Sequence, residues 1–203
     1  MGERLTLDGV CRRRHWIFDL DGTLTHPVHD FAAIRRELDV PDHAPILEHL
    51  ATLPAAEAAP RLARLDAIET AACARATPRP GAAALLTGLR RRGCRLGIVS
   101  RNRLASVRRT LEATGLAGYF ADPDLVGRDE ALPKPDPSGL LLLLTAWRAA
   151  PDDAVMVGDF VHDLDAGRAA GVATIYLDWQ RSARWTAHAD LTLDDLQSLV
   201  AGA

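Results

Sequence analysis

The chain has 203 residues, 48% of them hydrophobic and 25% charged, proportions that are typical of a globular domain and exclude a disordered or fibrous chain. Its 24 basic and 27 acidic side chains give a formal net charge of −3, so a dedicated nucleic-acid or membrane-surface partner is not expected. No apolar run approaches the roughly 18 residues of a membrane-spanning helix, and the first dozen residues lack the apolar core of a signal peptide.

Short apolar runs alternate with helical stretches along most of the chain. Five runs predict strands, at residues 15–18, 95–99, 154–157, 173–177 and 191–193, with a closing helix at 194–200. Nearly continuous apolar strands indicate a parallel sheet that is buried on both faces by helices. We therefore predict an α/β fold with a Rossmann-like core, in which polar residues after the strands gather at one edge of the sheet.

Residues 25–79 interrupt this rhythm, because they contain no convincing strand and are rich in Ala, Leu, Glu and Arg. Apolar spacing predicts helices near 31–38 and 57–76. We interpret 25–79 as a small helical cap, hinged at 25–27 and 77–81, and 1–24 with 80–203 as the α/β core. The alternative is that these helices pack against the sheet edge within a single domain.

The three cysteines, Cys11, Cys73 and Cys94, are odd in number, and no two have the C-x-x-C spacing of a zinc or redox site. A disulfide framework is therefore not expected. We interpret them as thiols in a reducing compartment and expect a cytoplasmic protein.

Acidic residues follow two of the predicted strands. Asp19 and Asp21 come after the first strand, and Asp159 and Asp163 come after the third. Asp163 lies one helical turn beyond Asp159, so both can face one site. Carboxylates gathered in this way repel one another unless a cation is bound, and hard oxygen ligands suit Mg²⁺. An ordinary acidic turn is the alternative interpretation of the Asp21-Gly22 step.

Other residues at the same edge could bind an anion. Thr23 offers a hydroxyl and an amide after the first strand, and Ser100, Arg101 and Asn102 follow the second strand. Lys134 lies between two prolines, which stiffen the chain around its ammonium group. Together these residues predict a phosphate-binding site beside the acidic cluster.

In this order, the four elements resemble the haloacid dehalogenase superfamily of aspartate-nucleophile phosphatases. Its motifs are matched by Asp19-Leu20-Asp21-Gly22-Thr23, Ser100, Lys134-Pro135-Asp136-Pro137, and Gly158-Asp159 with Asp163. The resemblance covers about residues 15–178. The place of the helical insert is similar to that of the cap in the branch containing phosphoglycolate phosphatase and β-phosphoglucomutase.

The resemblance implies that Asp19 attacks phosphorus and becomes an aspartyl-phosphate, while Asp21 acts as general acid and base. It further implies that Mg²⁺ is held by Asp19, the Asp21 carbonyl and Asp159, with Asp163 in or near the coordination sphere. Ser100 and Lys134 would bind the phosphoryl oxygens.

The expected activity is Mg²⁺-dependent hydrolysis of a small phosphorylated metabolite. A phosphosugar mutase of the β-phosphoglucomutase type is the alternative, and a dehalogenase is less favoured because it has no use for the Asp21 acid/base. A metal- or phospho-ligand-binding regulator is disfavoured because no motif residue is lost.

The substrate and the oligomeric state cannot be read from the sequence. His26, His29 and Arg35 are the candidate substrate contacts in the predicted cap. Phe160 and Arg101 depart from the usual family pattern, and Arg101 could reach the substrate.

Overall fold

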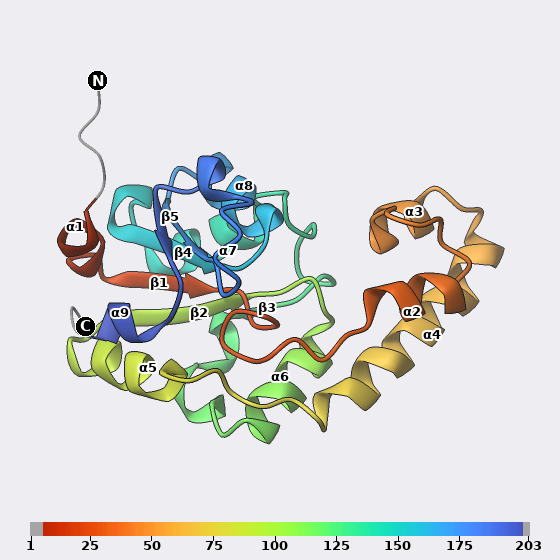
Figure 1. Cartoon of the computed structure of the whole chain (residues 1–203), viewed down its shortest axis with the longest axis horizontal. Coiled ribbons are helices and arrows are strands. Elements are labelled where there is room, and N and C mark those ends of the chain that lie inside the picture. Colours follow the sequence, from red (N-terminus) through yellow and green to blue (C-terminus); the bar gives the residue numbers. More distant parts are fainter. Residues whose placement is uncertain (1–5, 201–203) are drawn as a thin grey trace.

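The computed structural model describes residues 6–200, which form a six-stranded sheet flanked by helices (Figure 1). The strands are β1 (His15–Phe18), β2 (Arg95–Val99), β3 (Leu125–Val126), β4 (Ala154–Gly158), β5 (Ala173–Leu177) and β6 (Leu191–Leu193). Their order is β3-β2-β1-β4-β5-β6, and all the pairings are parallel. The predicted α/β fold is confirmed, with one added strand, β3, which is only two residues long.

Helices cover both faces of this sheet (Figure 1). Those of the core are α1 (Leu7–Cys11), α5 (Ala82–Arg91), α6 (Leu104–Ala113), α7 (Ser138–Trp147), α8 (Val161–Ala169) and α9 (Gln197–Val200). Short 3₁₀ turns lie at Ala117–Tyr119, Asp122–Asp124, Pro151–Asp153 and Thr186–His188. The closing helix α9 begins three residues later than predicted. Within residues 6–200, no helix has both the length and the apolar character to cross a membrane.

The strand β1 shows how the sheet divides the core into two layers. Its alternate residues Trp16 and Phe18 belong to a cluster that includes α5 and α6 side chains. Ile17, between them, belongs to a second cluster with Leu140 and Leu143 of α7. All three β1 side chains are completely buried, as the period of two in a strand requires when both faces are covered. The carboxyl end of β1 is therefore held rigidly from both sides.

Between β1 and α5 the chain forms three helices that extend away from the sheet (Figure 1). They are α2 (Phe31–Glu37), α3 (Ile46–Ala51) and α4 (Ala55–Cys73), of which α3 was not predicted. Apolar side chains from all three form a cluster of their own, comprising Ile34, Leu38, Val40, Ile46, Leu50 and Leu65. We call residues 25–79 the helical segment.

The helical segment leaves and rejoins the core through two connections that lie side by side. The His26 amide donates a hydrogen bond to the Thr77 carbonyl at 2.9 Å, and Thr25 forms an antiparallel bridge with Pro78. The Arg79 amide donates to the Leu24 carbonyl at 2.8 Å. The outgoing connection therefore starts from the loop that follows β1 and carries Asp21, and the return connection is hydrogen-bonded beside it.

Candidate active site

The loop after β1 is a tight turn that begins at Asp19. The Asp19 amide donates to the Val157 carbonyl at 2.9 Å, which ties this position to β4, and the Gly22 amide donates to the Thr25 carbonyl at 2.9 Å. Gly22 has a φ of +93°, and a Cβ there would lie 2.3 Å from Oδ2 of Asp159. Only glycine can therefore occupy this position, because it tolerates the left-handed backbone and leaves room for the carboxylate.

Lys134 joins two of the predicted acidic residues. Its Nζ lies 2.7 Å from Oδ1 of Asp19 and 2.7 Å from Oδ1 of Asp163, and the side chain is only 1% exposed. Burial alone would lower the pKa of Lys134, but the negative charges of Asp163 and Asp19 outweigh it and hold the pKa above its usual value. The ammonium group is therefore charged at any working pH.

Lys134 is also the only lysine among the 203 residues; the other lysine-or-arginine positions are all arginines. An ammonium group is a compact point charge, whereas a guanidinium is a wide planar fork. The narrow space between Asp19 and Asp163 suits the former. This compositional signal, a single lysine in a chain rich in arginine, points to the same residue as the motif.

Asp159 and Asp163 approach Asp19 from β4 and α8. Oδ2 of Asp163 accepts a hydrogen bond from the Phe160 amide at 3.1 Å, and the Thr23 hydroxyl donates to Oδ1 of Asp159 at 3.1 Å. One carboxylate oxygen from each of Asp19, Asp159 and Asp163 lies within 4.8 Å of the others. Burial, followed by the charges of Asp19 and Asp163, raises the pKa of Asp159 above its usual range. Burial likewise raises the pKa of Asp19, although Lys134 opposes this effect.

This donor set fits a divalent metal ion. Three carboxylates crowd one buried point, where burial and the neighbouring carboxylates raise the pKa values of Asp19 and Asp159, so a bound cation would favour their ionised forms. Oδ1 of Asp21 is buried and has no hydrogen-bond partner within the described part of the chain. Carboxylate oxygens are hard ligands of the kind that Mg²⁺ prefers.

Asp21 lies beside residues that follow β2. Its Oδ2 accepts a hydrogen bond from Nδ2 of Asn102 at 2.7 Å, and the Asn102 amide donates to the Ser100 hydroxyl at 3.1 Å. Burial, with smaller contributions from Glu69 and Asp159, raises the pKa of Asp21 to about 6. A carboxyl group with such a pKa can both give and accept a proton near neutral pH.

The side chain of Arg101 points toward the helical segment, whereas its neighbour Asn102 contacts Asp21. Its Nη2 lies 2.8 and 2.9 Å from the two carboxylate oxygens of Glu48, on α3 of the helical segment. Its Nη1 donates to the Lys134 carbonyl. The residue predicted to bind phosphate thus links the core to the helical segment, an ion pair that no sequence pattern revealed.

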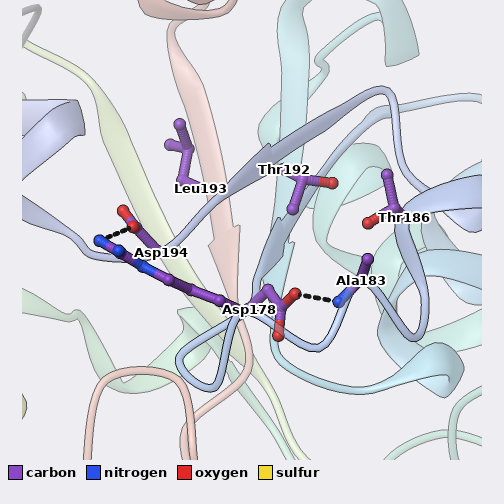
Figure 2. Close-up of a pocket in the computed structure, with 7 residues that line it drawn as sticks. Asp178, Ala183, Thr186, Thr192, Leu193 and Asp194 are labelled. Carbon is purple, nitrogen blue, oxygen red and sulfur yellow. Dashed lines mark hydrogen bonds and ion pairs between the residues drawn. The ribbon is translucent and has the colours of Figure 1, made fainter.

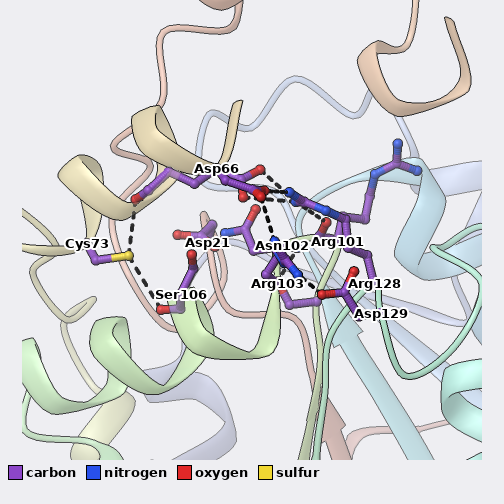
Figure 3. A network of polar contacts seen from close by, with 11 residues as sticks. Asp21, Asp66, Cys73, Arg101, Asn102, Arg103, Ser106, Arg128 and Asp129 are labelled. Carbon is purple, nitrogen blue, oxygen red and sulfur yellow. Dashed lines mark hydrogen bonds and ion pairs between the residues drawn. The ribbon is translucent and has the colours of Figure 1, made fainter. Parts of the chain in front are cut away.

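A second set of ion pairs joins α4 to the core (Figure 3). Nη1 of Arg128 lies 2.9 Å from Glu69, and Nη2 contacts Asp66. Arg103 lies 2.6 Å from Asp66 and 2.7 Å from Asp129. Arg128 and Glu69 expose only 8% and 7% of their side chains, so this end of the helical segment is fixed firmly on the core.

The three candidate substrate contacts of the helical segment lie in different surroundings. His26 lies on the outgoing connection, and Nε2 of His29 is buried without a hydrogen-bond partner in the described structure. Burial, followed by the charge of Arg75, lowers the pKa of His29. Nε of Arg35 donates a hydrogen bond to the Ala44 carbonyl at 2.9 Å, so its guanidinium group makes a contact within the helical segment.

Comparison with known proteins relates this chain to a family of hydrolases. A family model described as haloacid dehalogenase-like hydrolase matches residues 14–171. Phosphoglycolate phosphatase of Rhodospirillum rubrum is 36% identical to the chain, covering 80% of it and 78% of that protein. The pyrophosphatase PpaX of Bacillus velezensis is 37% identical over 46% of the chain and 43% of its own length.

Solved structures agree on the fold. A hydrolase from Pseudomonas syringae superposes with a TM-score of 0.77 at 21% identity, covering 93% of the chain and 97% of that protein. At this identity the likeness establishes the fold alone, whereas the family match rests on the sequence comparisons. The chain therefore belongs to the haloacid dehalogenase-like hydrolases, a family in which its relatives include phosphatases.

Proposed function

We propose that the protein is a Mg²⁺-dependent phosphatase that hydrolyses a small phosphorylated metabolite through an aspartyl-phosphate on Asp19. The observation that carries this proposal is the placement of the Asp19 carboxylate, held by Lys134 at 2.7 Å and gathered with Asp159 and Asp163 at one end of the sheet. The names of the phosphatase relatives support the same class of reaction.

In the first step, a carboxylate oxygen of Asp19 forms a bond to phosphorus, and the bond from phosphorus to the leaving oxygen breaks. Asp21 gives its proton to that oxygen, which departs as an alcohol. The hydrogen bond from Asn102 keeps the Asp21 carboxyl group in place for this transfer. The pKa of about 6 leaves a fraction of Asp21 protonated at neutral pH.

In the second step, a water molecule attacks phosphorus and transfers a proton to the Asp21 carboxylate. The bond between phosphorus and Asp19 then breaks, which releases inorganic phosphate and restores both carboxyl groups. Lys134, with its charge beside Asp19, lowers the repulsion between that carboxylate and the anionic phosphoryl group.

The phosphoryl oxygens are expected to contact Lys134, the Ser100 hydroxyl, and the loop groups of Thr23 and Asn102. Phosphoryl transfer depends mainly on such positioning and on charge stabilisation. The carboxylates of Asp19, Asp159 and Asp163, with the Asp21 carbonyl, would hold Mg²⁺, which when bound neutralises charge on the phosphoryl group.

We further propose that the helical segment, residues 25–79, is a cap that selects the substrate, and that residues 1–24 and 80–203 form the catalytic core. The segment has its own apolar cluster, and its two connections lie side by side at the loop that carries Asp21. His26, His29 and Arg35 are proposed as substrate contacts, with the unpartnered nitrogen of His29 the strongest candidate. Arg101 would reach the substrate only after releasing Glu48.

The test is release of inorganic phosphate from p-nitrophenyl phosphate, with 2-phosphoglycolate, pyrophosphate and β-glucose 1-phosphate as further substrates. We expect hydrolysis that requires Mg²⁺ and stops with EDTA. Turnover that continues in EDTA would contradict the metal requirement. Conversion of β-glucose 1-phosphate to glucose 6-phosphate with little phosphate release would instead establish the mutase alternative.

A further inference from the structure

Trp179 links the loop after β5 to the loop that carries Asp21. Its indole Nε1 donates a hydrogen bond to the Gly22 carbonyl at 2.7 Å, although the two residues are 157 positions apart. The ring is half-buried and packs against the core cluster on the α5 and α6 side of the sheet.

The loop that presents Trp179 is itself well ordered by the preceding residue. Oδ1 of Asp178 accepts hydrogen bonds from the Ser182 amide at 3.0 Å and from the Tyr176 hydroxyl at 3.2 Å. Its Oδ2 accepts one from the Ala183 amide at 2.6 Å, on the wall of a shallow pocket beside β6 (Figure 2). A buried carboxylate with several donors fixes the start of this loop, so the direction of Trp179 is determined by the fold.

The indole ring of Trp179 also contacts Arg79, in the return connection of the helical segment. The guanidinium carbon of Arg79 lies 4.1 Å from the ring centre, in a cation–π contact. The Arg79 amide is bonded to the Leu24 carbonyl, and its Nε is buried with no hydrogen-bond partner in the described structure. Trp179 thus lies between the return connection and the turn at Gly22.

We propose that Trp179 is a positioning residue for the Asp21–Thr23 turn and, through that turn, for the metal-binding carboxylates. Its indole N–H fixes the Gly22 carbonyl, and therefore the peptide that leads to Thr23. The Thr23 hydroxyl in turn donates to Asp159 at 3.1 Å, and the missing Cβ of Gly22 leaves room for the same carboxylate. This inference rests on the proposed function only in taking the acidic cluster as a Mg²⁺ site.

The experiment compares Trp179→Phe with Trp185→Phe in the full-length chain. Phenylalanine keeps an aromatic ring under Arg79 but removes the N–H donor together with the five-membered ring of the indole, and the control variant accounts for that loss of size. Trp185 is the control because it is also half-buried with an arginine over its ring, Arg184 at 4.6 Å, and packs edge-on against Phe160 rather than against the Gly22 turn. Mg²⁺ binding is measured by isothermal titration calorimetry, and amide hydrogen exchange is followed in a peptide spanning residues 19–26.

We expect Trp179→Phe to weaken Mg²⁺ binding at least fivefold and to speed exchange at Gly22 to Thr25, with strand β1 unchanged. Its kcat should fall about tenfold while the KM for p-nitrophenyl phosphate stays within twofold. Trp185→Phe should match the unmodified protein in all of these. A general loss of stability would speed exchange throughout the protein, so faster exchange in this turn alone indicates a local effect of Trp179.

Unchanged exchange in the 19–26 peptide of Trp179→Phe would overturn the proposal, as would an Mg²⁺ dissociation constant within twofold of that of the unmodified protein. Equal losses in the two variants would also overturn it, since the effect would then come from removing any half-buried indole. If the unmodified protein binds Mg²⁺ but hydrolyses no phosphate ester, the proposed function fails while the binding and exchange results still decide the role of Trp179.

Discussion

The α/β core and the helical segment are held together in different ways. In the core, the β1 residues Trp16, Ile17 and Phe18 are completely buried between two layers of helices, and the acidic residues follow directly after β1 and β4. The helical segment has one small apolar cluster and meets the core through its two connections, the packing of α4 against α6 and several ion pairs. Under the proposed function, the catalytic carboxylates lie on the core and the proposed substrate contacts lie on the helical segment.

The helical segment itself has two unlike attachments. In the C-terminal half of α4, Glu69 and Asp66 bind Arg128, whose side chain is nearly buried. At α3, Arg101 binds Glu48, and their side chains are 24% and 42% exposed. Water screens the second pair much more than the first. We infer that α4 stays fixed while α3 can separate from Arg101, and five predictions test these contrasts.

The largest effect is expected at the core carboxylate that is proposed to attack phosphorus. Asp19→Asn should lower kcat by about a thousandfold or more, because an amide oxygen is a poor nucleophile. Phosphate release under saturating substrate measures this. Asp165→Asn is the control, since Asp165 pairs with His188 on the far side of α8 and should keep kcat within about twofold. Turnover retained by Asp19→Asn would disprove the nucleophile assignment.

Removing the buried cation should destabilise the core strongly. Lys134→Met would leave Asp19 and Asp163 without their shared partner and should lower the free energy of unfolding by about 3–5 kcal/mol at pH 8. The loss should be smaller at pH 5, because protonation then removes carboxylate charge. Urea unfolding at both pH values measures it. Arg108→Met, at an exposed pair, is the control and should leave the urea unfolding curve nearly unchanged.

Two arginines that share Asp66 allow a direct comparison at the base of α4. Arg128→Met should lower the free energy of unfolding by about 3 kcal/mol, because it leaves Glu69 buried without its ion pair. Arg103→Met should cost much less, because the Arg103 side chain is 49% exposed and water screens its ion pairs. Equal losses in urea unfolding would show that burial does not distinguish the two contacts.

Metal binding should become stronger as the pH rises, because the carboxylates of the site must lose their protons to bind a cation. Burial raises the pKa values of Asp19, Asp21 and Asp159, so the folded protein holds these protons more tightly than the unfolded chain. Without metal, their contribution to stability is therefore present near pH 4 and is lost as the pH rises through about 6 and above.

Because Mg²⁺ competes with those protons, it should stabilise the protein more at pH 8 than at pH 5. At a concentration 100 times its dissociation constant, it should add about 2.7 kcal/mol at pH 8. Thermal unfolding with and without Mg²⁺ at each pH gives the difference. A shift that is the same at both pH values would mean that the ion binds elsewhere, and Asp159→Asn should abolish the shift.

The smallest effect is expected at α3. Glu48→Gln should change the free energy of unfolding by less than about 1 kcal/mol, and a double-mutant cycle with Arg101→Met should give a coupling of similar size. Urea unfolding of the four proteins provides the cycle. A coupling near 3 kcal/mol would show that α3 is fixed as firmly as α4 and would remove the contrast between the two attachments.

The fold could be predicted largely from the sequence because buried parallel strands are continuous apolar runs that end in polar residues. Strand β3 was missed because two residues, Leu125 and Val126, show no periodicity, and they are recognised as a strand only through their pairing with β2. Helix α9 begins later than predicted because apolar spacing does not fix where a helix starts.

Within the site, the sequence predicted which motif residues meet, but it did not predict the contacts between other loops. The order of the motifs predicted that Asp19, Lys134, Asp159 and Asp163 meet, and the structure brings them together, although their catalytic roles stay predictions. The contacts of Arg101 with Glu48 and of Trp179 with Gly22 depend on how separate segments pack, which no local pattern encodes.

The single lysine has a practical consequence. Apart from the amino terminus, reagents that modify primary amines have one target in this sequence, and in the folded state that target is 1% exposed. Reductive methylation should therefore label Lys134 only when its surroundings open, so the rate of labelling reports local opening beside Asp19. A methyl group added there would give one NMR resonance in the whole protein from this position, with no background from other side chains.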